Sequence, residues 1–75
     1  MKFEWLLDDL KGNHLLCIKR DRASFFRGTL SPEVNGRRLW RPFPEAEPQE
    51  VCGDLQTARR HCEAIVRQRS VVELR

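Results

Sequence analysis

The sequence predicts a small α+β domain in which an antiparallel sheet of three to four strands packs against one C-terminal amphipathic helix. Short apolar runs, each bounded by turn residues, fill the chain up to about residue 43. The dipeptide Asn35-Gly36 is typical of the tight turn of a hairpin. From Asp54 onward the apolar residues recur at helical spacing.

The length of 75 residues is that of one domain. A chain of this size buries roughly 60% of the surface of its unfolded state, so two separate cores are excluded. We expect a sheet over residues 3–43, a proline-rich acidic connector over 42–53, a helix over 54–69 and a tail over 70–75. A homodimer would add apolar burial, and a purely structural dimer is one reading of so small a fold.

The first segment, residues 3–11, fits two structures. Its apolar residues have helical spacing, with Gly12 as a cap, but Phe3, Trp5 and Leu7 also alternate as in a strand. The aspartates at 8 and 9 would lie at the negative end of a helix, which is unfavourable. We therefore favour a strand that turns at Lys11-Gly12-Asn13.

Two further strands follow. The apolar run inside His14–Arg20 predicts a strand that is covered on much of both faces. Ser24–Leu30 is rich in aromatic residues and threonine, as strands are. Alternation would place Phe26, Gly28 and Leu30 on one face and Phe25, Arg27 and Thr29 on the other. Gly28 is expected to mark a bulge or a close approach of the helix.

The hairpin turn at Asn35-Gly36 leads into a strand over Arg37–Arg41. Leu39 should lie on one face of that strand, and Arg38 and Trp40 on the other. Three prolines and several acids then predict an extended connector over residues 42–48, anchored to the core by Phe43.

The helix should begin at Asp54, a natural N-cap, and its pattern breaks at Ser70. Residues 71–74 would then form a short strand or a frayed tail. The expected buried stripe consists of Leu55, Ala58, Cys62, Ile65 and Val66. The expected outer face consists of Gln56, Arg59, Arg60, Glu63 and Arg67.

The sequence has no residue pattern typical of a catalytic or metal site. The three cysteines, Cys17, Cys52 and Cys62, have no paired spacing and are expected as reduced thiols in or near the core. His61 diverges from its neighbour Cys62 on a helix, so the two form neither a metal site nor a nucleophile with its base. We expect no enzyme, no cofactor and no metal. Without a long apolar run or a leader pattern, a cytoplasmic location and no membrane contact are expected.

Charge is distributed by segment. The net charge is +3, and residues 17–41 carry seven basic against two acidic side chains, whereas residues 42–54 carry four acids and no base. Most of the basic residues are arginine, which binds phosphate with a planar fork and stacks on rings. Arginine enrichment also follows from a G+C-rich genome, and a charged face is often merely solvated.

Basic side chains interleaved with aromatic ones on a sheet are typical of nucleic-acid binding. A single sheet face would carry Lys19, Arg20, Arg27, Arg38, Trp40 and Arg41, with Phe25 beside them. The outer face of the helix, with Arg59, Arg60 and Arg67, would add a second basic contact. In the alternative interpretation, Phe25 and Trp40 pack under the helix and the arginines only fringe them.

Three strands followed by one amphipathic helix, over residues 14–67 of an arginine-rich chain, resemble the amino-terminal arm-binding domains of phage integrases in the order of elements. That resemblance implies a sheet inserted into the DNA major groove. More loosely, the chain is similar to small accessory proteins of phages and mobile elements, which often bind one host protein. Two functions are therefore expected: a module that binds DNA or RNA, or one that inhibits or adapts a host nucleic-acid-binding complex.

Overall fold

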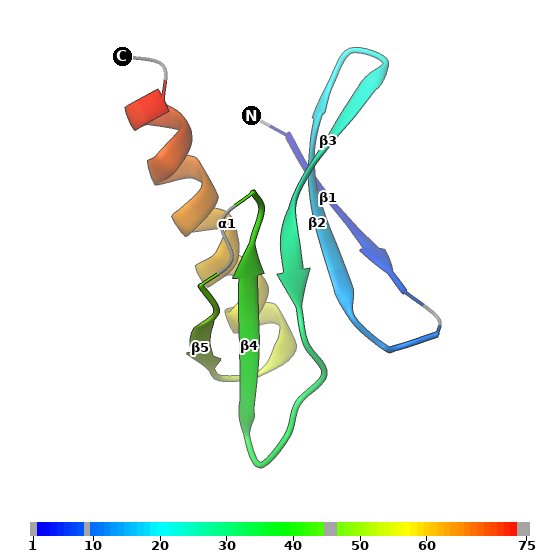
Figure 1. Ribbon diagram of the computed structural model, residues 1–75, viewed down its shortest axis with the longest axis vertical. Coiled ribbons are helices and arrows are strands. Elements are labelled where there is room, and N and C mark those ends of the chain that lie inside the picture. The colour runs from blue at the N-terminus through cyan, green and yellow to red at the C-terminus, as the bar shows by residue number, and fades with distance from the viewer. Residues whose placement is uncertain (1, 9, 45–46, 74–75) are drawn as a thin grey trace.

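The computed structural model describes all residues except 1, 9, 45–46 and 74–75, and is shown in Figure 1. Its strands and helix are β1 (Lys2–Leu7), β2 (His14–Arg20), β3 (Ala23–Leu30), β4 (Arg37–Pro42), β5 (Gln49–Cys52) and α1 (Leu55–Glu73). The strands form one antiparallel sheet in the order β1-β2-β3-β4-β5, so each strand pairs with its neighbours in the sequence. Helix α1 lies against one face of the sheet (Figure 1). The α+β class is confirmed.

Five strands replace the predicted three to four because β5 forms inside the expected connector. This strand pairs with β4 at the edge of the sheet, from Arg37↔Cys52 to Trp40↔Gln49. Among its four residues only Val51 is buried, so the strand offers no apolar alternation to read in the sequence. Residues 45–46 of the connector lie outside the described residues.

The first segment is a strand, as favoured, and it turns back into β2. The amide of Asp8 donates to the carbonyl of Asn13 at 2.8 Å, and Gly12 has a φ of 72°. Strand β2 has the predicted bounds, and Leu16, Cys17 and Ile18 at its centre are buried although successive side chains point to opposite faces. The centre of this strand, which lies between β1 and β3, is therefore covered on both faces of the sheet.

Strand β3 contains a bulge that reverses part of the predicted pattern. Cys17 pairs with Phe26 and its neighbour Leu16 pairs with Gly28, which leaves Arg27 as an extra residue. Phe26 and Gly28 therefore lie on opposite faces, not on one face as alternation predicted. Gly28 does mark the bulge, but the group that approaches it is the ring of Trp40: a Cβ there would lie 2.5 Å from Cη2 of that indole.

The turn at Asn35-Gly36 is confirmed. Both residues have positive φ, 54° and 77°, which the two-residue type I′ turn requires. Val34 and Arg37 exchange two backbone hydrogen bonds across it, at 2.8 and 3.1 Å. Beyond this turn β4 keeps the predicted facing and ends at Pro42.

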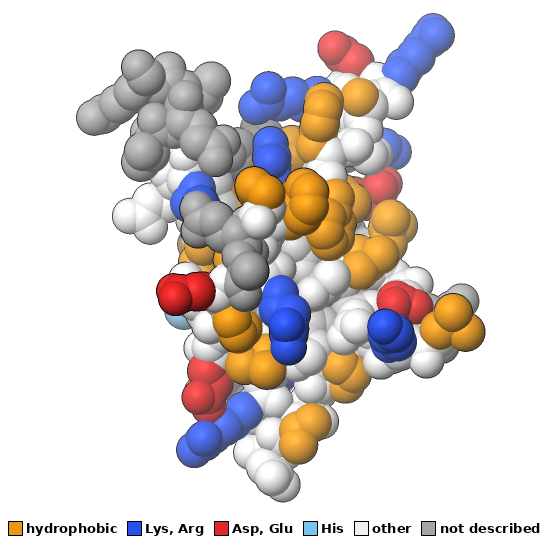
Figure 2. All heavy atoms as spheres, viewed as in Figure 1, with side chains coloured by type: hydrophobic (Ala, Val, Ile, Leu, Met, Phe, Trp, Pro, Cys, Tyr) orange, Lys and Arg blue, Asp and Glu red, His pale blue; other side chains and the backbone are white. Residues whose placement is uncertain are grey.

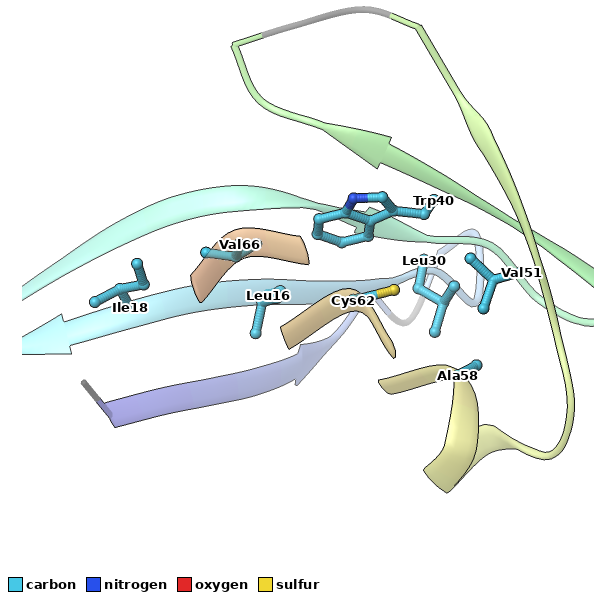
Figure 3. Close-up of a cluster of buried hydrophobic side chains, with 8 residues drawn as sticks. All are labelled: Leu16, Ile18, Leu30, Trp40, Val51, Ala58, Cys62 and Val66. Atoms are coloured by element: carbon cyan, nitrogen blue, oxygen red, sulfur yellow. The ribbon is translucent and has the colours of Figure 1, made fainter. Parts of the chain in front are cut away.

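The core lies between α1 and the sheet and is centred on Trp40 (Figure 3). Each fully buried large apolar side chain stabilises the fold by roughly 1.5–3 kcal/mol. The sheet contributes Leu16, Ile18, Leu30, Trp40 and Val51, and the helix contributes Ala58, Cys62 and Val66. Leu55 and Ile65 pack at the margin of this cluster, which confirms the predicted stripe.

Helix α1 begins as predicted, because Oδ1 of Asp54 accepts the Thr57 amide at 2.8 Å. This hydrogen bond lowers the pKa of the Asp54 carboxyl. The helix continues through Ser70 to Glu73, so neither a strand nor a frayed tail forms at 71–73, and Leu74 lies outside the described residues. Serine interrupts an apolar pattern but does not end a helix, and no glycine or proline follows it. Within the described residues, no helix is both long and apolar enough to cross a membrane.

Candidate nucleic-acid interface

The predicted basic face is divided between the two sides of the sheet. We call the side that α1 covers the helix side and the other the open face. Pairing with Val51 and Leu30 places Arg38 and Trp40 on the helix side. Arg20 follows the buried Leu16 and Ile18 on that same side, whereas Lys19 lies on the open face. Arg41 is also on the open face, because it neighbours Trp40 along β4.

Two predicted residues are used inside the fold. The side chain of Trp40 is completely buried, so its ring is not available to stack on a base. Arg38 is partly buried and donates from Nη1 to the carbonyl of Ser31 at 3.2 Å. Phe25 lies opposite Ile18 on the helix side, with 46% of its surface exposed. The alternative in which Trp40 packs under the helix is therefore the correct one.

The helix arginines also have structural contacts. Arg59 lies over the ring of Trp5, 5.3 Å from its centroid, and Arg67 lies over the ring of Phe3 at 5.2 Å. Both lie on the side of α1 next to β1, where Arg59 is half-buried, contrary to the prediction, and Arg67 is exposed, as predicted. Arg60 remains on the exposed surface of the helix. Of the three predicted helix arginines, Arg60 and Arg67 therefore remain exposed to solvent.

The open face carries an aromatic pair that the sequence interpretation missed. The rings of Phe26 and Phe43 lie 5.3 Å apart between centroids and are tilted by 53°. They are 38% and 54% exposed. The amide of Phe43 donates to the carbonyl of Arg27 at 2.9 Å. This hydrogen bond extends the pairing of β3 with β4 by one residue and places the Phe43 ring beside the bulge. Phe43 is thus not the core anchor that was expected.

Charged side chains flank this pair along β4. Arg37, Leu39 and Arg41 alternate on the open face and lead toward Phe43. Arg37 pairs with Glu50 at 3.0 Å, and Lys19 pairs with Glu4 at 3.2 Å. Arg41 is exposed, and among the described residues no acidic group pairs with it. Figure 2, in which β4 lies in front of α1, shows apolar side chains over the middle strands with basic ones among them.

A groove borders the open-face side chains of β4 at the end of the strand that carries Arg37. Its volume is about 520 Å³, counted with its open mouth. It is lined by Ser31, Val34, Arg37, Arg38, Leu39 and Glu50. The open face therefore combines the exposed rings of Phe26 and Phe43 and exposed cationic groups on β4, and a partly apolar groove borders the start of β4.

Among the described residues, the thiols and carboxylates do not gather into a metal site. Cys17 and Cys62 are buried, but Cys52 is exposed, contrary to the expectation for all three. Burial raises the pKa of the Cys62 thiol to about 12, so thiolate is scarce there at neutral pH. Within the described part of the chain, no three metal-binding side chains gather at one point.

Comparisons with protein families, with curated proteins and with solved structures gave no match for this chain.

Proposed function

We propose that the protein is a non-enzymatic module that binds single-stranded nucleic acid on its open face. The observation that carries this proposal is the exposed pair Phe26 and Phe43 beside the exposed Arg41. A ring that stacks on a base contributes about 1–3 kcal/mol, and an arginine beside it neutralises phosphate. Paired bases hide their faces, so exposed rings favour a single strand over a duplex.

The open-face side chains from Arg37 to Phe43 match the length and direction of an extended nucleic-acid strand. From Phe43 to Arg37 the backbone spans about 20 Å at roughly 3.3 Å per residue. A nucleic-acid strand lying along β4 would place the bases at one end toward Phe43 and Phe26. Its other end would reach the groove beside Leu39. Arg41, between these two points, would contact the phosphates.

The test is fluorescence anisotropy with labelled single-stranded DNA and RNA oligonucleotides, at low and at physiological salt. Replacing Phe26 and Phe43 by alanine together should weaken binding at least tenfold, because two stacking contacts are lost. Arg41→Ala should weaken binding and reduce the salt dependence by about one released counterion.

Arg60→Ala is the matched control, since it removes the same charge from the exposed surface of α1. This variant should bind nearly as well as the wild type. Absence of binding to either nucleic acid at low salt would refute the function. Equal losses in the Arg41 and Arg60 variants would refute the assignment to the open face.

A second candidate function is a protein-interaction module that inhibits or adapts a host nucleic-acid-binding complex. The apolar content of the open face favours it, since Leu6 and Leu39, which lie on the same face as the aromatic pair, are 47% and 39% exposed. Here the oligonucleotides would not bind, and a purified host complex would lose its nucleic acid on addition of the protein. The Phe26 and Phe43 double variant should have no such effect. Sedimentation of a monomer at micromolar concentration would exclude a purely structural dimer.

A further inference from the structure

Strand β1 lies at one edge of the sheet, and among the described strands only β2 pairs with it (Figure 1). The amide of Asp8, just after the strand, donates to the carbonyl of Asn13 on the β2 side. Backbone groups point alternately to the two sides of a strand, so those of Phe3, Trp5 and Leu7 point away from β2. A row of outward N–H and carbonyl groups is a template for another strand.

Natural edge strands usually carry a feature that prevents such pairing. Strand β1 contains no proline, and its register with β2 runs from Lys2 to Leu7 without a bulge. At the opposite edge β5 has only four residues and directly follows Pro48. Leu6 and Leu7, at the end of β1, are 47% and 58% exposed. The edge at β1 is therefore the better one for pairing with a further strand.

The sequence of β1 is complementary to itself in one antiparallel register, which we call the Trp5 register. It places Trp5 opposite the partner's Trp5 and Phe3 opposite the partner's Leu7. Every outward backbone group of both strands is then paired. The exposed side chain of Leu7 packs on the ring of the partner's Phe3, because directly opposite residues point to the same face.

Charge selects the same register. Within its own chain Lys2 lies opposite Lys19, and no described acidic group forms an ion pair with it. In the Trp5 register, Lys2 lies opposite the partner's Asp8. A shift by two residues places Glu4 opposite the partner's Glu4 in one direction and the partner's Asp8 in the other. Both shifts set like charges against each other, which weakens strand pairing, and both leave one outward residue beyond the partner's strand.

We propose that two copies of the protein form a symmetric dimer in which their β1 strands pair in the Trp5 register and join the two sheets into one. Strand β4 lies three strands away from this edge, so the rings and arginine of the open face stay accessible in the dimer. The dimer does not depend on nucleic-acid binding by that face.

Sedimentation equilibrium and amide hydrogen exchange of the wild-type protein test the dimer and its edge. A dimer should form between micromolar and millimolar concentration. The amides of Phe3, Trp5 and Leu7 should exchange more slowly as the protein concentration rises, because each gains an acceptor only in the dimer. A monomer over the whole range would overturn the proposal. Concentration-dependent protection of β5 instead of β1 would overturn it as well.

Proline at position 7 removes one outward amide from each copy and no hydrogen bond within the monomer. Leu7→Pro should therefore weaken dimerisation at least tenfold. Leu7→Val is the matched control, since valine is similar in size to proline and keeps the amide. The valine variant should dimerise within about threefold of the wild type. Equal dimerisation of the two variants would refute pairing through β1.

Charge exchange tests the register. Lys2→Glu chains set acid against acid, and Asp8→Lys chains set base against base, so each variant alone should dimerise at least about threefold more weakly than the wild type. In a mixture each variant is complementary to the other at both positions. Native mass spectrometry should then find the heterodimer above its statistical share, and a purely statistical share would refute the Trp5 register. If the Asp8 variant does not fold, hydrogen exchange and the Leu7 variants still decide the proposal.

Discussion

The indole N–H of Trp5 donates to Oε2 of Glu63 at 2.7 Å, across 58 residues of sequence. Arg59, one turn earlier on α1, lies over the same indole ring. Its Nη2 also lies 3.2 Å from Nδ1 of His14. The first strand, the second strand and the helix thus meet in one polar cluster at the margin of the core.

Replacing Trp5 by phenylalanine should lower the free energy of unfolding by at least about 1.5 kcal/mol, because a hydrogen bond to a charged acceptor is lost together with part of the ring. Urea denaturation measures this change. In a double-mutant cycle with Glu63→Gln, the pair should show a coupling energy of at least about 0.5 kcal/mol. Additive effects of the two substitutions would mean that the contact contributes nothing.

Gly28→Ala should be strongly destabilising. An added Cβ would lie 2.5 Å from Cη2 of Trp40 and 2.6 Å from the carbonyl oxygen of Arg41, and the φ of 153° is strained for other residues. We expect a loss of about 3 kcal/mol, from overpacking and backbone strain together.

Gly36→Ala is the matched control for that substitution, because its Cβ meets nothing closer than 4.0 Å. Its cost should come from the positive φ alone and be about 1 kcal/mol. Similar thermal unfolding temperatures for the two alanine variants would contradict the packing of the indole on Gly28.

Stability should depend on pH through His14. Burial, followed by the charges of Arg59 and Arg38, lowers the pKa of its imidazole in the folded state. The unfolded chain therefore binds the proton more readily, and stability is lost as pH falls through about 6.5, the ordinary value for histidine. Stability stops falling once the pH is below the pKa of the His14 imidazole in the folded state. Urea titrations between neutral pH and pH 5 measure the slope, which His14→Gln should reduce; an unchanged slope in that variant would assign it to other groups.

The three thiols should differ in reactivity. Cys52 is exposed, whereas Cys17 and Cys62 are buried and burial raises the pKa of both. Since the thiolate is the reactive form, a disulfide reagent should modify one thiol per folded chain quickly and the other two only on unfolding. Mass spectrometry of the early product should find the label at Cys52, and early labelling of Cys62 would contradict the described core.

Much of the fold follows from local signals in the sequence. The turn at Asn35-Gly36 and the cap at Asp54 each depend on the preference of one or two residues. The apolar stripe of α1 and the run at the centre of β2 depend on periodicity. Strand β5 escaped detection because three of its four residues are exposed and its pairing with β4 is visible only in three dimensions.

The candidate site was harder to predict because it depends on which face each side chain takes. One extra residue, Arg27, reverses the facing of Phe26 and removes it from the side of Gly28. Trp40 and Arg41 are adjacent, yet one is in the core and the other on the open face. No local signal distinguishes these faces, since a bulge is set by the partner strand as well as by its own sequence.

The burial of Trp40 bears on how the chain is made. The hairpins of β1 to β4 use neighbouring segments and can form as soon as those segments leave the ribosome. The helix side chains of the core, Ala58, Cys62 and Val66, are translated after Trp40. During that interval the sheet exposes the largest apolar ring of its core, so the nascent chain is most prone to aggregate just before the helix is complete.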